Sequence, residues 1–345
     1  MNLSDFEYHL PEELIAQQAL TARDGSRMLV LNRTTGAIEH STFAHLADHL
    51  TGRELIIYNN SKVMPARIFA RKESGGRVEL LALRIISPRR FEAMTRTSKP
   101  LRVGQFLTPD RGVGTVRIVE LPVPGRAVVE VAPETTAIDL IFAAGKMPLP
   151  PYIRRRPDSD DGEDLTRYQT IFADPVGSVA APTAGLHFTP ARVAQLKAMG
   201  CLFAEVTLHV GPGTFQPVRV QSIEEHIMET EHYEISAATA SAIASAQLEG
   251  RPILAVGTTT VRTLETAAQA NKTVLPGAGA SQLFIYPGYP FKVVDKMITN
   301  FHLPGSTLIM LVSALAGREH ILRAYEEAVA RQYRFYSYGD CMLIG

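Results

Sequence analysis

The chain has 345 residues, 46% of them hydrophobic and 20% charged, with 35 basic and 35 acidic residues that leave no net formal charge. This length allows two domains with a sizeable core, and the composition is typical of a globular protein. No apolar run has membrane length, and two distant cysteines indicate neither a disulfide framework nor a thiolate metal site. We therefore expect a cytoplasmic protein without a membrane partner.

The first 63 residues predict alternating helices and strands. A helix is expected from Leu10, where Pro and two acidic residues occupy the first turn, and another after Thr42, which can cap a run of apolar residues at helical spacing. Strands are expected over 27–32, 37–40 and 54–58. This alternation indicates the start of an α/β domain.

The segment 64–150 has a different pattern, with short β-rich runs separated by Gly- and Pro-rich turns. Its expected strands are 68–71, 77–86, 91–95, 114–120 and 127–131, and helical patterning returns only at 135–144. Several short strands with such turns predict a small barrel or sandwich. We therefore expect an all-β, barrel-like domain at 64–150, inserted into a discontinuous α/β catalytic domain with a mixed sheet, residues 1–63 and 151–345.

The inserted segment is also strongly basic. Thirteen basic and four acidic residues lie between Lys62 and Arg117, so the rest of this neutral chain carries the balancing negative charge. A basic module on an acidic body is typical of a protein that holds a phosphate-rich partner in a fixed orientation. Outward Lys and Arg on strands serve solubility equally well, so the charge alone leaves both interpretations open.

Residues 151–345 return to alternating elements. Thr189 and Ser236 are expected to cap helices that end near Gly200 and Gly250, and further helices are expected after Gly257 and over 308–316 and 319–331. Strands are expected over 202–210, 228–235, 252–256, 282–286, 293–298 and 341–344. This order again indicates an α/β domain.

Three segments of this part share one form, a strand end followed by a small or polar loop and a helix start. They are 183–189, 257–262 and 300–307, and they carry His187, Arg262 and His302, while His209 ends a fourth strand. In open α/β sheets, ligands bind where strand ends give way to loops. Each histidine by itself is equally consistent with a structural hydrogen bond.

Several enzyme classes lack their motif in this chain. No histidine pair has helical i, i+4 spacing with a catalytic acid, and the glycines near Gly211 do not complete a dinucleotide fingerprint. A GxSxG nucleophile elbow is also absent. These absences argue against a metallohydrolase, a nicotinamide enzyme and an α/β-hydrolase, and we expect no metal.

A set of phrases in order along nearly the whole chain resembles the S-adenosylmethionine:tRNA ribosyltransferase-isomerase family of queuosine synthesis. The most specific phrase is Ala-Pro-Thr-Ala-Gly-Leu-His-Phe at 181–188. The others begin at Tyr58 (YNNSKVMPAR), Arg167 (RYQT), Thr207 (TLHVGPGTF), Gly257 (GTTTVR), Asn300 (NFHLP) and Tyr338 (YGD).

This resemblance implies an unusual use of S-adenosylmethionine, as a ribosyl donor. The enzyme would transfer and isomerise the ribosyl group onto a 7-aminomethyl-7-deazaguanine at the wobble position of tRNA, giving epoxyqueuosine and releasing adenine and methionine. The sulfonium acidifies the adjacent 5′ carbon, so a general base starts the reaction and an acid assists the departure of adenine. Histidine can serve in either proton-transfer step.

Site residues follow from side-chain chemistry and motif position. His187, His209 and His302 are candidates for proton transfer. Tyr168 is expected to stack on a base. Gly257, Thr258, Thr259 and Thr260 with Arg262 are expected to hold the methionine carboxylate or ribose, and Asp340 the ribose hydroxyls. The tRNA backbone is assigned to Arg89, Arg90, Arg96, Arg154, Arg155 and Arg156. A scaffold role is at least as consistent with each of these residues.

Two alternatives from other classes stay open, a non-catalytic tRNA-binding protein and an S-adenosylmethionine-dependent RNA methyltransferase. A methyltransferase would release S-adenosylhomocysteine and no free adenine, whereas a binding protein would release neither. The expected partner in all three cases is tRNA, and we expect the protein to be a monomer.

Overall fold

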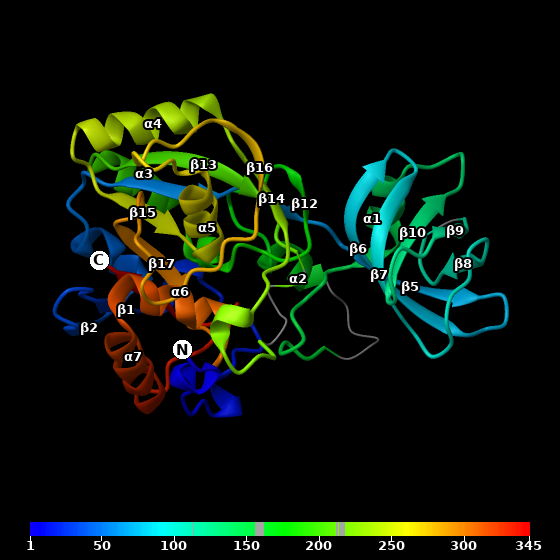
Figure 1. Ribbon diagram of the computed structural model, residues 1–345, viewed down its shortest axis with the longest axis horizontal. Helices are drawn as coiled ribbons and strands as arrows, with labels where there is room; N and C mark the ends of the chain where they lie inside the picture. Colours follow the sequence, from blue (N-terminus) through cyan, green and yellow to red (C-terminus); the bar gives the residue numbers. More distant parts are fainter. Residues whose placement is uncertain (113, 156–161, 212, 214–217) are drawn as a thin grey trace.

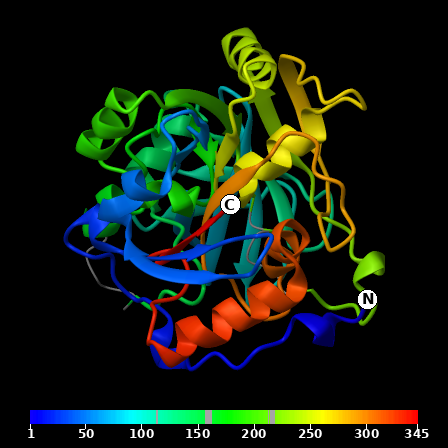
Figure 2. The ribbon, with the colours of Figure 1, turned by 90° about the vertical axis from the view of Figure 1, so that its left-hand side faces the viewer.

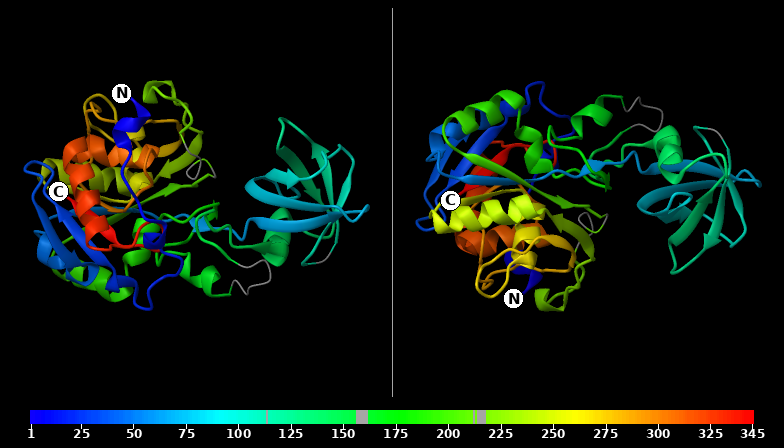
Figure 3. Two further views of the ribbon diagram at one scale, coloured as in Figure 1. Left: turned by 90° about the horizontal axis from the view of Figure 1, so that it is seen from below. Right: turned by 90° about the horizontal axis from the view of Figure 1, so that it is seen from above.

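The computed structural model describes residues 1–112, 114–155, 162–211, 213 and 218–345. Figure 1 shows a large α/β body and a smaller β-barrel beside it. The chain enters the barrel at β5 (Arg67–Lys72) and leaves it after β11 (Gly145–Lys146). Two connecting segments run between body and barrel, as the views in Figure 3 show.

The body is built on one nine-stranded mixed sheet. Its four central strands, β13, β3, β15 and β17, are parallel to one another, and β18 pairs antiparallel with β17. In spatial order the strands are β16 (Gly277–Ser281), β14 (Glu231–Ile235), β13 (Leu202–Leu208), β3 (Leu55–Asn59), β15 (Ile253–Val256), β17 (Lys296–Asn300), β18 (Cys341–Ile344), β1 (Arg27–Leu31) and β2 (Ile38–Thr42).

Both faces of this sheet are covered, and the central strand β15, Ile-Leu-Ala-Val, is apolar and buried throughout. Along β3, Ile57 packs into the core on one face and Ile56 into the core on the other, because successive side chains of a strand point to opposite faces. The first face carries α4 (Ala237–Leu248), α5 (Thr258–Ala267), α6 (Thr307–Ala316) and α7 (Arg318–Ala330). The second carries the short 3₁₀ helices η4 (Phe43–His49) and η5 (Thr183–His187) and the helix α3 (Pro190–Ala198). Figure 2 shows the two layers beside the sheet.

The barrel closes through six antiparallel strands. The ring runs β5, β6 (Arg77–Ser87), β7 (Arg90–Thr97), β10 (Arg126–Val131), β9 (Val116–Glu120) and β8 (Phe106–Pro109), and β8 pairs back with β5. Alternate residues such as Leu80, Phe91 and Ile118 fill its interior. The helix α1 (Ala137–Ala144) adds Leu140 and Ile141 to that core.

Short elements complete the described chain. They are η1 (Leu3–Phe6), η2 (Glu12–Leu14), η3 (Arg23–Gly25), β4 (Lys62–Val63), α2 (Gly162–Arg167), β12 (Val176–Ser178) and η7 (Ile223–Glu225). Within the described ranges no helix combines the length and apolar character needed to cross a bilayer. The same residues contain no cluster of three or more His, Cys, Asp or Glu side chains suited to a metal ion.

The expected fold class, a mixed-sheet α/β domain with an inserted all-β barrel, is confirmed. Several element predictions differ from the structure. The helix expected from Leu10 is only the three-residue η2, and β8 was not expected. The expected strand at 282–286 is absent: the preceding segment Gly277–Ser281 pairs with β14 instead, and the Leu283 carbonyl accepts from Arg262 Nε at 3.2 Å.

Candidate active site

The carboxyl ends of the four parallel central strands meet at one edge of the body sheet. His209 follows β13, Gly257 follows β15, and Asn300 ends β17 with His302 two residues later. Because β18 runs antiparallel to β17 and begins opposite Asn300, Asp340 lies at the same edge. Thr183 and Ala184 line the same cavity as Gly257 and Asn300, so the three predicted loop segments are gathered at one place, as expected for an α/β ligand site.

A cavity of about 90 Å³ opens at this edge, the place where ligands bind in open α/β sheets. Its walls combine apolar residues such as Ala184, Val210 and Phe301 with the polar side chains of Tyr152, Tyr168, Thr183, Thr258, Thr259, Thr299, Asn300, His302, Ser306, Tyr336 and Ser337. None of the described residues that line it is Asp, Glu, Lys or Arg. With its histidine neutral, the cavity has no formal charge.

Gly257 brings the start of α5 into this cavity. Its φ of 87° and ψ of 157° lie in a region essentially restricted to glycine, and the turn places Thr258 and Thr259 in the cavity wall. Thr260 is fully buried and donates from Oγ1 to the Val256 carbonyl at 2.8 Å. The predicted Gly-Thr-Thr-Thr turn therefore contributes its first three residues to the cavity and uses the fourth to fix the helix entrance.

His302 lies in the cavity wall and is only 8% exposed. Its Nε2 is 2.8 Å from Thr299 Oγ1, and its backbone N–H donates to the Tyr325 hydroxyl at 3.0 Å. Burial lowers the pKa of His302 to about 3, so the ring is neutral at physiological pH.

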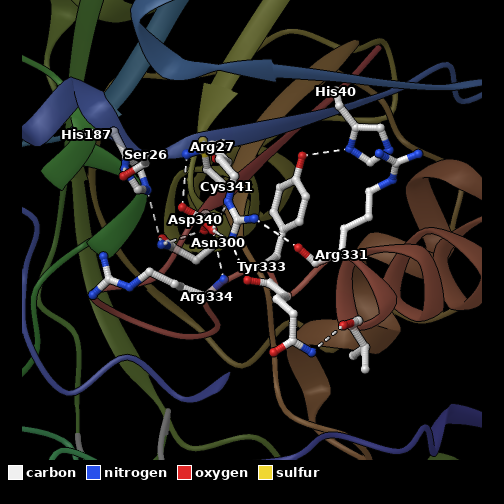
Figure 4. A network of polar contacts seen from close by, with 12 residues as sticks. Ser26, Arg27, His40, His187, Asn300, Arg331, Tyr333, Arg334, Asp340 and Cys341 are labelled. Carbon is white, nitrogen blue, oxygen red and sulfur yellow. Dashed lines mark hydrogen bonds and ion pairs between the residues drawn. The ribbon is translucent and has the colours of Figure 1, made fainter. Parts of the chain in front are cut away.

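His187 is buried beside the cavity rather than in its wall, and both of its ring nitrogens have partners. Nδ1 lies 3.0 Å from Ser26 Oγ, and Nε2 lies 3.2 Å from Asn300 Nδ2, an arrangement drawn in Figure 4. Burial, with Arg23 and Arg334 nearby, lowers the pKa of His187 to about 4. His187 also lines a smaller hollow with Arg23 and Arg167.

His209 lines a different space, a cleft of about 780 Å³ between body and barrel. Its ring packs on Gly177, where an added Cβ would come within 2.7 Å of the imidazole. Its Nδ1 is buried and has no hydrogen-bond partner among the described residues. Burial and the nearby His232 lower the pKa of His209. Val210 borders both the cleft and the cavity, so His209 lies one residue away from the cavity wall.

Two predicted ligand-binding residues are engaged within the protein and are not part of the cavity wall. Arg262 is buried and forms an ion pair with Glu231, whose other oxygen accepts from the Gly211 N–H at 3.2 Å. Asp340 is 1% exposed and accepts from the backbone N–H groups of Arg27 at 2.9 Å and Arg334 at 2.8 Å. These contacts assign both side chains a role in holding loops at the sheet edge.

Tyr168 does line the cavity, and its hydroxyl is one of three buried polar atoms there that have no hydrogen-bond partner among the described residues. This hydroxyl faces Ser337 and the Ala181 backbone without adequate hydrogen-bond geometry. The other two atoms are the Tyr336 hydroxyl and Asn300 Oδ1. Burial raises the pKa of both tyrosines, so both hydroxyls keep their protons.

The predicted tRNA-binding arginines fall into two groups. Arg89, Arg90 and Arg96 are exposed on the barrel, and Arg90 pairs with Glu130 at 2.9 Å. Arg89 and Arg90 lie at the β6–β7 turn, whereas Arg96 is six residues further along β7, about 20 Å away at the spacing of a strand. Arg154 and Arg155 pair with Glu12 and Asp164, and Arg156 lies outside the described residues.

Sequence reasoning did not select Asn300 or Tyr336 as site residues. Asn300 belongs to the phrase that contributed His302, but an asparagine at a strand end is commonly structural. Tyr336 has a φ of 70°, a conformation that is rare for a side-chain-bearing residue and that clusters at functional sites. No sequence signal reveals that conformation.

Comparisons with known proteins give one consistent result. The model of the family described as "Queuosine biosynthesis protein" matches residues 3–344. A protein of Pelobacter propionicus named S-adenosylmethionine:tRNA ribosyltransferase-isomerase is 48% identical over 346 residues, which cover 100% of both chains. A protein of Anaeromyxobacter sp. with the same name is 50% identical over 348 residues, covering 100% of this chain and 99% of the relative.

A solved structure is similar as well. The crystal structure of S-adenosylmethionine tRNA ribosyltransferase from Thermotoga maritima is 36% identical in sequence and superposes with a TM-score of 0.56. The match covers 99% of this chain and 100% of the crystallised one. The similarity therefore extends over body and barrel together.

Proposed function

Because the chain belongs to the queuosine biosynthesis protein family, we propose that it is an S-adenosylmethionine:tRNA ribosyltransferase-isomerase. The observation that carries this proposal is its full-length similarity, at 48–50% identity, to relatives that bear this name. The uncharged cavity at the sheet edge and the basic barrel beside it supply two sites of suitable chemistry, one for a nucleoside and one for an RNA backbone.

The proposed reaction joins the ribosyl group of S-adenosylmethionine to the aminomethyl nitrogen of 7-aminomethyl-7-deazaguanine at the tRNA wobble position. The bonds from the ribosyl group to adenine and to sulfur break, so adenine and methionine leave, and rearrangement yields the epoxycyclopentanediol of epoxyqueuosine. The sulfonium makes the adjacent 5′ carbon acidic, and the departing adenine requires a proton.

We assign the proton transfers to His209 and His302. Both are neutral near pH 7, because burial lowers the pKa of each, and a neutral imidazole is able to accept a proton. His302 lies in the cavity wall, whereas His209 borders the cleft toward the barrel. This placement favours His209 for steps near the wobble base and His302 for steps near the nucleoside.

The tRNA partner is assigned to the basic barrel and the cleft beside it. Arg84 and Arg126 line the cleft from the barrel, and Arg89 is exposed at the adjoining β6–β7 turn. A wobble nucleotide that reaches the body from this side passes His209 first. Arg154 and Arg155 remain assigned to the RNA backbone, and contact with phosphate there exchanges their pairs with Glu12 and Asp164.

A single-turnover assay tests the proposal. The enzyme is mixed with S-adenosylmethionine and tRNA that carries 7-aminomethyl-7-deazaguanine, and the products are separated by chromatography. We expect one free adenine and one methionine for each modified nucleoside. Release of S-adenosylhomocysteine would instead identify a methyltransferase, and binding without any released product would identify a tRNA-binding protein.

A further inference from the structure

The geometry points to one half of S-adenosylmethionine as the ligand of the sheet-edge cavity, and to one hydrogen bond that holds it there. This cavity binds the adenosine half of S-adenosylmethionine, Asn300 Oδ1 accepts a hydrogen bond from it, and His187 is a positioning residue that fixes the Asn300 amide. The inference rests on the proposed function for the identity of the nucleoside. It concerns binding, so it is tested without turnover.

The first step of the argument is the orientation of the Asn300 amide. Its Nδ2 lies 3.2 Å from the Tyr336 carbonyl oxygen and 3.4 Å from the Asp340 carbonyl oxygen. Carbonyl oxygens only accept hydrogen bonds, so the NH₂ group must face them and Oδ1 must point the other way. Asn300 is 3% exposed and lines the cavity, and its Oδ1 has no partner among the described residues.

The second step concerns His187. The NH₂ group of Asn300 also faces His187 Nε2 at 3.2 Å, so this nitrogen is the acceptor and carries no proton. The proton is therefore on Nδ1 and is donated to Ser26 Oγ at 3.0 Å (Figure 4). With both nitrogens engaged in this way, the ring holds Asn300 in place and is not free to exchange a proton with a ligand in the cavity.

The third step identifies the ligand chemistry. Among the described residues, the fully buried polar side-chain atoms of the cavity that lack a partner are one acceptor, Asn300 Oδ1, and two hydroxyls, those of Tyr168 and Tyr336. Buried polar atoms of this kind are costly unless a ligand pairs with them. Adenine and ribose carry both N–H or O–H donors and neutral acceptors. The methionyl half carries an ammonium and a carboxylate, and burying these against walls without charged side chains is strongly unfavourable.

The experiment uses 5′-methylthioadenosine, which keeps adenine, ribose and a neutral thioether but has neither the ammonium nor the carboxylate. Its dissociation constant and that of S-adenosylmethionine are measured by calorimetry on the full chain. The measurements are made with and without a saturating anticodon stem–loop that has unmodified guanine at the wobble position, so that no turnover occurs. We expect wild-type protein to bind both ligands.

Asn300→Leu is expected to weaken both ligands by the same factor, about tenfold, because both lose the same hydrogen bond. A loss confined to S-adenosylmethionine would place the amino acid half in the cavity and overturn the inference. Failure of wild-type protein to bind methylthioadenosine under either condition would overturn it as well.

Two substitutions at His187 separate positioning from general packing. His187→Gln offers an amide oxygen near the site of Nε2, so it keeps an acceptor for Asn300, whereas His187→Met has similar length and no such acceptor. We expect His187→Gln to retain affinity within about threefold and His187→Met to lose about as much as Asn300→Leu. A double variant that combines His187→Met with Asn300→Leu should bind no more weakly than Asn300→Leu alone, because the two changes remove the same interaction. Equal losses for His187→Gln and His187→Met would contradict the positioning role.

A measurement on unmodified protein avoids any folding defect of the variants. Nitrogen-15 spectra of histidine-labelled wild-type protein report which ring nitrogen of His187 carries the proton. We expect protonation at Nδ1, and protonation at Nε2 would overturn the assignment because that nitrogen could not accept from Asn300. These binding and spectroscopic results do not depend on adenine release, so failure of the proposed function is detected separately.

Discussion

The carboxylate of Asp340 gathers several donors from different parts of the chain at the sheet edge. Besides the backbone N–H groups of Arg27 and Arg334, it accepts from the Arg27 guanidinium at 3.1 Å, and its own carbonyl lies next to Asn300 (Figure 4). The side chain of Asp340 is 2% exposed, so the loss of its charge leaves donors unpaired in a buried place.

Asp340→Asn is therefore expected to lower the free energy of unfolding by about 2–3 kcal/mol, measured by urea denaturation. The matched control is Asp48→Asn, which removes an exposed pair with His45 and should cost less than about 0.5 kcal/mol. Equal effects of the two substitutions would contradict the role assigned to Asp340.

His302 predicts how stability depends on pH. Its folded pKa of about 3 lies below the value of about 6.5 for the unfolded chain, so the unfolded chain takes up the proton first as the pH falls. The stabilisation is complete above about pH 6.5 and is lost progressively as the pH falls toward 3. At pH 5 the loss from this one group amounts to about 2 kcal/mol.

Urea denaturation at pH 7 and pH 5 measures this effect. Wild-type protein is expected to lose about 2 kcal/mol more between the two values than His302→Gln, which has no group to protonate there. His45→Gln, a change at an exposed histidine, should keep the wild-type pH dependence. If wild-type and His302→Gln lose the same amount, His302 is not held neutral by burial.

At the residue scale, the sequence predicted well which segments contribute to the site. It predicted less well which atoms of those segments face the cavity. His302, Tyr168, Thr258 and Thr259 lie in the cavity wall, as the motifs led us to expect. The ion-pair partner of the buried Arg262 could not be predicted. It is Glu231, which lies on a strand 31 residues away in sequence. The orientation of the Asn300 amide likewise depends on carbonyls about 40 residues away.

At the scale of elements, Gly257 controls how α5 enters the site. Gly257→Ala is expected to cost about 2 kcal/mol of stability, because its backbone conformation is essentially restricted to glycine, and to weaken S-adenosylmethionine binding about tenfold by shifting Thr258 and Thr259. An added Cβ would only touch Ala184 Cβ at 3.5 Å, so backbone strain is the cause. Calorimetric binding and urea denaturation measure the two effects.

Gly250→Ala provides the matched control for that prediction. Gly250 follows α4 with a φ of 61°, and an added Cβ would meet nothing within 4 Å. We expect a loss of about 1 kcal/mol in stability and unchanged ligand affinity, because this turn is far from the cavity. A similar loss of affinity in both variants would mean that stability alone explains the effect at Gly257.

Helix starts were predicted well where a capping side chain next to the helix determines them. Thr189 and Ser236 accept from the backbone N–H groups of Arg192 and Thr239, as the cap predictions require. The strand β16 was missed because Gly277–Ser281 has small residues with low strand propensity, and pairing with β14 determines its conformation. Thr42 makes no side-chain cap, and the helix after it is 3₁₀.

At the scale of the whole molecule, the class of the fold was predictable and the strand order was not. Alternating helix and strand signals gave the α/β body, and the Gly- and Pro-punctuated strands gave the barrel. The order of the sheet, with β3 between β13 and β15, joins segments about 150 to 200 residues apart, and no local pattern encodes such pairing. Closure of the barrel depends on β8, which pairs with both β9 and β5.

The arrangement of barrel and body also predicts how tRNA binding depends on salt. Arg89 and Arg90 lie at the β6–β7 turn, and β6 and β7 also carry Arg84 and Glu92 of the cleft that His209 lines; we propose that the two arginines contact phosphates of a nucleotide entering that cleft. Neutralising both with Gln should weaken binding of an anticodon stem–loop. In a plot of the logarithm of the binding constant against the logarithm of the salt concentration, the line should also become less steep. Its slope should change by about 0.7–0.9 for each phosphate that the protein no longer neutralises.

Fluorescence anisotropy across a range of KCl concentrations measures that slope. Arg96→Gln, further along β7, should reduce it by less than the double change, since it removes a single positive charge. Lys272 lies by the amino end of β15, at the edge opposite the cavity. The variant Lys272→Gln should therefore leave the slope unchanged. If the double change at Arg89 and Arg90 behaves like Lys272→Gln, the RNA backbone does not run along this turn and the wobble base reaches the cleft from another side.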